Sequence, residues 1–123
     1  MKPFETLTVC GKEYHFKLTA AYAVQLENEL NTDILSGLDT LAEIKTLAKY
    51  LFYASVSQND DINKIDDIYQ LIDDYITEGG TIDGLQHFIM DILLTSGILT
   101  KDVYEASKKA LEKQKKALQQ LLN

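Results

Sequence analysis

The chain has 123 residues, of which 46% are hydrophobic and 25% charged, and this length and composition indicate a single globular domain rather than a disordered or fibrous protein. A net charge of −7 with no arginine argues against nucleic acid as the main partner, because the chain repels a polyanion and lacks the side chain that grips phosphate best. No apolar run approaches the roughly 18 to 20 residues of a membrane span, and the first residues lack the apolar stretch of a secretion signal, so we expect a cytoplasmic protein without a membrane partner.

The first residues predict a β-hairpin. Residues 4–9 and 13–18 alternate and are rich in β-branched or aromatic side chains, with residues 10–12 as the turn. One face of the hairpin is expected to be apolar: Leu7, Val9, Tyr14, Phe16 and Leu18. Because a lone hairpin is marginal in water, this face must lie on the helices or on another copy of the chain. The outer backbone edges are expected to remain available for pairing.

The remainder of the chain is predicted to be helical. Thr19 is a suitable N-cap for a helix over residues 20–30, and Asn31 suits the left-handed position that follows. A short helical turn over residues 32–36 is expected to stop at Gly37.

A longer helix is expected to open at Asp39 or Thr40 and to end near Ser57, before a loop over residues 58–61. The following helix shows the clearest stripe, with acidic residues facing away from it. Its stripe residues are Ile65, Ile68, Tyr69, Ile72, Tyr75 and Ile76.

Gly79 and Gly80 end that helix, and Thr81 or Asp83 caps the next one, which Ser96 and Gly97 stop. This helix is apolar on more than one face, so we expect it to be central. Its apolar residues are Leu85, Phe88, Ile89, Met90, Ile92, Leu93 and Leu94.

A C-terminal helix is predicted from Thr100 nearly to Leu122. Its apolar stripe is thin and consists of Tyr104, Leu111, Leu118 and Leu122. Such a narrow stripe suits a partner helix better than a core, so these four residues are the candidate partner-binding site. The alternative is that the helix packs back on its own bundle or frays.

Together these elements predict a mainly α protein with an N-terminal β-hairpin, an α+β fold whose helices form a small bundle of about five. We expect one domain over residues 1–123. It divides into the hairpin (4–18), the helical bundle (19–99) and a C-terminal helical tail (100–123).

The sequence offers no catalytic, cofactor-binding or metal-binding constellation, so we expect a protein that is not an enzyme. His15 and His87 lie far apart in sequence, and Cys10 is the single cysteine. Residues 60–67 resemble a calcium loop in composition but lack its glycine and its final glutamate. We interpret them as a loop leading into the first turn of a helix, where aspartates oppose the helix dipole favourably.

Charge is unevenly distributed along the chain. Between residues 59 and 91, nine carboxylates face Lys64 alone, whereas six lysines outnumber three acids from Lys101 onward. This pattern predicts that the tail pairs with an acidic face, within one molecule or between copies. The spaced pairs Asp66-Asp67 and Asp73-Asp74 favour an acidic docking face over a catalytic dyad.

The order of elements and several short motifs resemble the tail assembly chaperones of long-tailed phages. The matching segments are Val9-Cys10-Gly11-Lys12-Glu13-Tyr14, Leu26-Glu27-Asn28-Glu29-Leu30, Asp73-Asp74-Tyr75-Ile76 running into Gly79-Gly80, and Ser96-Gly97. Family members often carry a glycine where this chain has Asn31, and both residues tolerate the left-handed conformation. The resemblance spans roughly residues 4–99.

The resemblance implies a non-enzymatic role in which the chain binds the tape-measure protein, keeps it soluble and helps to recruit tail tube subunits. It also implies a longer form made by ribosomal frameshifting, whose second domain contacts the tail tube protein, with this chain as the short form. We then expect a protein of the host cytoplasm that is absent from the mature virion, and a homo-oligomer is possible. The alternative is a small acidic helical adaptor, inhibitor or antitoxin that binds a basic protein partner.

Overall fold

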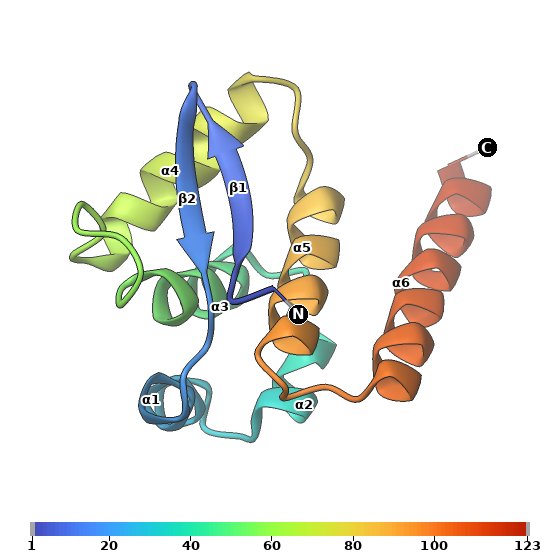
Figure 1. Ribbon diagram of the computed structural model, residues 1–123. Helices are drawn as coiled ribbons and strands as arrows, with labels where there is room; N and C mark the ends of the chain where they lie inside the picture. The colour runs from blue at the N-terminus through green and yellow to red at the C-terminus, as the bar shows by residue number, and fades with distance from the viewer. Residues whose placement is uncertain (1, 123) are drawn as a thin grey trace.

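Over residues 2–122 a two-stranded hairpin is followed by six α-helices, which confirms the predicted α+β fold (Figure 1). The structure, a computed structural model, describes residues 2–122. In chain order the elements are β1 (Glu5–Val9), β2 (Lys12–Phe16), α1 (Ala20–Leu30), α2 (Ile34–Gly37), the 3-10 helix η1 (Leu38–Thr40), α3 (Ile44–Ser55), α4 (Ile65–Thr77), α5 (Ile82–Thr95) and α6 (Lys101–Leu122).

The hairpin turn contains two residues, Cys10 and Gly11, with φ angles of 52° and 76°. Positive φ at both positions defines a type I′ turn, whose twist matches that of the flanking strands. Lys12, which the sequence placed in the turn, pairs with Val9 as part of β2. Glu78, just after α4, accepts a hydrogen bond from the Cys10 N–H and so ties the turn to the helices.

The outer edge of β2 is covered, contrary to the expectation that both hairpin edges remain available. The Asn59 side chain accepts a hydrogen bond from the His15 N–H at 3.0 Å and donates one to the His15 carbonyl at 2.7 Å. The Lys17 N–H donates to the Ala54 carbonyl at 2.8 Å. The end of α3 and the loop after it therefore satisfy backbone groups of His15 and Lys17 that another strand would need.

Helix α1 has the predicted ends, with Thr19 at the N-cap and Asn31 in the left-handed conformation (φ 57°). The next helical turn begins at Ile34 rather than at residue 32, and Gly37 is its last residue, buried and in the right-handed helical conformation, from which the chain continues into η1. A Cβ at position 37 would lie 2.5 Å from the Tyr50 hydroxyl oxygen. That hydroxyl donates a 2.5 Å hydrogen bond to the Ile34 carbonyl, so close packing under Tyr50 requires the glycine.

Helix α3 begins at Ile44, four or five residues later than predicted. The chain winds directly from α2 into η1, and Leu41 is buried just after it. Leu41 therefore belongs to a turn, and Ile44, the first residue of α3, is 51% exposed. The helix also ends at Ser55 rather than near Ser57, because residues 56–58 form a turn.

The buried face of α4 differs from the predicted stripe. Leu71 is buried with Ile68 and Ile72, whereas Tyr69 and Ile76 are 37% and 42% exposed. This face of α4 is buried because α3 and strand β1 pack against it. The apolar periodicity of α4 alone does not show which of two overlapping faces these elements cover. The acidic side chains Asp66 and Asp73 point to solvent beside Tyr69 and Ile76.

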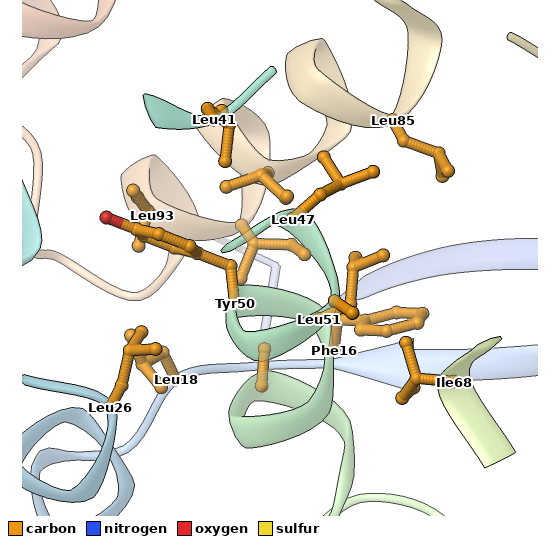
Figure 2. Close-up of a cluster of buried hydrophobic side chains, with 14 of the residues drawn as sticks. Phe16, Leu18, Leu26, Leu41, Leu47, Tyr50, Leu51, Ile68, Leu85 and Leu93 are labelled. Carbon is orange, nitrogen blue, oxygen red and sulfur yellow. The ribbon is translucent and has the colours of Figure 1, made fainter. Parts of the chain in front are cut away.

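Helix α5 is central, as predicted, because it contacts α3, β1 and α6. The Thr81 side chain caps it by accepting a hydrogen bond from the Gly84 N–H at 3.0 Å. Figure 2 shows the core that these elements share, with side chains contributed by β2, α3, α4 and α5. Labelled members include Phe16, Leu47, Tyr50, Leu51, Ile68, Leu85 and Leu93.

Candidate partner-binding site

Helix α6 lies antiparallel along α5 at one edge of the molecule (Figure 1). It has 22 residues against 14 in α5, so it is roughly 33 Å long beside a helix of roughly 21 Å. The difference leaves the end of α6 extending beyond α5. None of the described α6 side chains is fully buried.

Polar contacts fasten the first part of α6 to α5. Tyr104 donates a hydrogen bond to Asp91 at 2.5 Å, and Lys108 lies 3.3 Å from the same carboxylate. Burial, together with the hydrogen bond to Asp91, raises the pKa of Tyr104. Burial disfavours the charge on Lys108, but contacts with Tyr104 and Asp91 outweigh it and raise the pKa of this lysine.

Two further contacts follow along α6. His87 lies 3.5 Å from Glu112, and Lys115 lies 3.5 Å from Asp83 at the start of α5. The sequence predicted that the basic tail pairs with an acidic face either within one molecule or between copies, and the structure shows pairing within one molecule. The partners of the tail are Asp83 and Asp91 on α5.

Leu111 is the apolar residue at the middle of this contact and is partly buried. A cleft lies on each side of it, with volumes of about 90 Å³ and about 250 Å³. The smaller cleft is lined by Leu38, Asp39, Met90, Ser107, Ala110 and Gln114 in addition to Leu111. The larger one is lined by Ala42, Asp83, Gln86, Gln114, Lys115 and Leu118 in addition to Leu111. Helix α6 thus rests on the body without filling the space beneath it.

The four predicted site residues fall into two groups. Tyr104 and Leu111 face the body of the same chain, whereas Leu118 and Leu122 are 59% and 78% exposed. Leu121, which sequence reasoning missed, is 83% exposed. It lies three residues after Leu118 and therefore on the adjoining face of the helix, a spacing that could have revealed it.

The histidines and the cysteine occupy separate places in the fold. His15 stacks on Phe4 with 4.1 Å between ring centroids, and His87 lies under α6. Cys10 is exposed at the hairpin turn, where Glu78 raises the pKa of its thiol and so disfavours the reactive thiolate. Within residues 2–122, no group of three or more His, Cys, Asp or Glu side chains is placed to hold a metal ion.

No protein-family model matches this chain, and neither the curated proteins nor the solved structures contain a match. None of the helices over residues 2–122 combines the length and the hydropathy that a bilayer crossing requires.

Proposed function

We propose that this chain is a non-enzymatic tail assembly chaperone of a long-tailed phage, which binds the tape-measure protein during tail assembly. The observation that carries the proposal is the end of α6, where Leu118, Leu121 and Leu122 are exposed beyond the body. Leucines at this spacing form one side of a helix and suit the apolar stripe of a partner helix. The sequence resemblance described above supplies the identity of that partner.

A tape-measure protein is long, and its helical segments are prone to associate with one another. On this proposal one copy of the chain covers a short apolar segment with the end of α6, and many copies along the tape measure keep it soluble. The lysines Lys113 and Lys116 lie on the opposite side of α6 from Leu118, so a coated tape measure would present charge to solvent.

The direct test uses co-expression of the tagged chain with the tape-measure protein of its phage. The variant L118D/L122D should lose tape-measure co-purification, because two carboxylates replace the apolar contact. The matched control V24D/L35D changes two exposed apolar residues on α1 and α2 and should retain it. Equal recovery with L118D/L122D and wild type would contradict the proposed site.

We further propose that a longer form, produced by frameshifting, links this chain to the tail tube protein. Expression of the native gene with its downstream sequence, followed by capture through an N-terminal tag and intact-mass analysis, should show a second and longer product. Detection of the 123-residue species alone would contradict this part of the proposal.

The exposed face of α4 favours a second candidate, an acidic adaptor or inhibitor of a basic protein. Asp66 and Asp73 lie seven residues apart beside the partly exposed Tyr69 and Ile76, which resembles a docking surface for a cationic partner. On this alternative, D66N/D73N would abolish partner capture and L118D/L122D would leave it intact. Capture would also weaken steeply as salt increases.

A further inference from the structure

Helix α6 differs from the other long helices in how it is held. Its contacts with α5 are partly exposed ion pairs on either side of the partly buried Leu111, and none of its side chains over residues 101–122 is fully buried. By contrast, α3, α4 and α5 each bury three or more residues. Because α6 buries little apolar surface, we expect its displacement from the body to cost little free energy.

We propose that α6 occupies a groove that receives an amphipathic helix of the tape-measure protein, and that this helix displaces α6. The inference rests on the proposed function, since it names the surface that such a partner reaches once α6 moves. It also explains why Tyr104 and Leu111, half of the predicted partner-binding stripe, are covered in the isolated chain.

The charges along the groove define the partner. Asp91 and Asp83 lie two helical turns apart on α5 and contact Lys108 and Lys115, which are seven residues apart on α6. A helix that replaces α6 must bring two cations at the same separation, because removal of α6 leaves both carboxylates without these lysines. Leu111 stands midway between the two lysines, so the partner also needs an apolar residue at that position.

The fit of α6 in the groove is poor, which gives a partner room to bind better. Ser107, Ala110 and Gln114 are small or polar and line the cleft of about 90 Å³, and Gln114 also lines the cleft of about 250 Å³. A helix with larger apolar residues at these three positions would contact Leu38 and Met90 where α6 leaves space. Such a helix can overcome the advantage that α6 has from being attached to the same chain.

The connection between α5 and α6 allows this movement without disturbing the body. Ser96 accepts a hydrogen bond from the Leu18 N–H at 2.9 Å, and Leu99 is buried, so the connection is fixed up to that residue. Thr100 precedes the first residue of α6 and is exposed. Thr100 caps α6, since its side chain and its carbonyl accept hydrogen bonds from the Val103 and Tyr104 N–H groups at 3.2 and 2.9 Å. Thr100 and α6 can therefore swing together about the connection to Leu99 while residues 96–99 remain in place.

The test uses a synthetic peptide of residues 101–122 in which Ser107, Ala110 and Gln114 are replaced by leucine. The full chain should bind this peptide, and hydrogen exchange of its own α6 amides should become at least tenfold faster on binding. A control peptide that also carries K108E and K115E should bind at least tenfold more weakly. Absence of binding, equal binding of both peptides, or unchanged exchange in α6 would each overturn the proposal.

A locked chain provides the complementary test. The variant C10S/H87C/E112C places thiols at two positions whose side chains are 3.5 Å apart in the native protein, and a short bismaleimide can join them. The crosslinked chain should bind the leucine peptide at least tenfold more weakly than the same variant capped with a monofunctional maleimide. Circular dichroism of both forms confirms that they are folded, and equal affinity would overturn the proposal.

The same two forms separate this inference from the proposed function. If the capped form captures the tape-measure protein and the crosslinked form does not, both are supported. If both forms capture it equally, displacement of α6 is wrong and the proposed function stands. If neither the capped form nor the wild type captures it, the proposed function is wrong, whatever the peptide shows.

Discussion

The Lys115 ammonium lies 3.5 Å from the Asp83 carboxylate, near the point where α6 passes the first residue of α5. Before this ion pair α6 has a partner within its own chain, and after it the helix carries three exposed leucines. The division of one helix into a fastened part and an extended part underlies the proposals for function. The contacts that hold the first part of α6 on α5 can therefore be tested separately from partner binding.

Asp91 is the residue that holds the first part of α6 most directly, since it contacts both Tyr104 and Lys108. The substitution Asp91→Asn should speed tryptic cleavage within α6 by about 1.4- to fivefold, because exposed ion pairs contribute roughly 0.2–1 kcal/mol. The control Asp73→Asn removes an exposed carboxylate on α4 and should leave cleavage of α6 unchanged. Cleavage of α6 at the wild-type rate in D91N would contradict this account of the fastening.

Gly37 is required by packing rather than by backbone conformation. Gly37→Ala should cost about 1–3 kcal/mol in the free energy of unfolding, because the new methyl group would meet Tyr50. In a Tyr50→Phe background the hydroxyl is absent, so the additional cost of Gly37→Ala should be smaller. Denaturant unfolding of the four proteins in this cycle measures both costs, and strictly additive effects would contradict the packing argument.

Asn59 fastens the loop after α3 to the hairpin through three hydrogen bonds of its side chain, two with the His15 backbone and one with the Ser55 carbonyl. Asn59→Ala should therefore destabilise the protein by about 2–4 kcal/mol, since each lost bond contributes roughly 0.5–1.5 kcal/mol. Hydrogen exchange of the His15 amide should also become faster. The control Asn63→Ala removes an exposed side chain in the same loop, and a comparable loss of stability there would contradict the specific role of Asn59.

Asp67 gives the stability of α4 a predictable dependence on pH. The backbone N–H groups of Asn63 and Lys64 donate hydrogen bonds to its carboxylate and hold its pKa below the usual value of 3.8. The ionised form is thus favoured in the folded state, and its stabilising effect is present above about pH 4 and disappears as the pH falls through the lowered pKa.

The substitution Asp67→Ala should accordingly lower Tm at pH 7 and lower it less at pH 2.5. Asp66→Ala, in the same first turn of α4, serves as a matched control because its carboxylate lacks these two hydrogen bonds among the described contacts. Thermal unfolding followed by circular dichroism at both pH values measures the difference. An equal loss at pH 7 and pH 2.5 would contradict the role given to the ionised carboxylate.

Features that depend on a few neighbouring residues were predictable from the sequence. Asn31 in the left-handed conformation and the Thr81 cap follow from local chemistry, as does the alternation of the hairpin strands. Features that depend on distant contacts were not predictable. From the sequence, Gly37 is explained as a helix end, whereas the structure shows that its lack of a side chain makes room for Tyr50. Tyr69 fits the apolar stripe of α4 but is 37% exposed, because α3 and β1 pack on a different face of this helix.

The helix that carries the candidate site was predictable to the same extent, since the helix expected from Thr100 nearly to Leu122 is observed as α6. Tyr104, Leu111 and Leu118 lie seven residues apart along it, and their role in partner binding remains a prediction. Which part of the stripe is covered depends on how far α5 extends beside it, and the sequence of α6 does not contain that information. The outer edge of β2 was expected to be free for pairing, but Asn59 binds the His15 backbone there. Asn59 is 44 residues from His15 along the chain, so local sequence could not predict this contact.

The central claim is that this chain binds the tape-measure protein and keeps it soluble. The most direct measurement is size-exclusion chromatography with light scattering on the co-expressed pair, which gives the number of chains bound to each tape-measure protein. We predict a soluble complex that contains several copies of this chain on one tape measure. A tape-measure protein that remains insoluble in the presence of this chain, or that elutes without it, would contradict the claim.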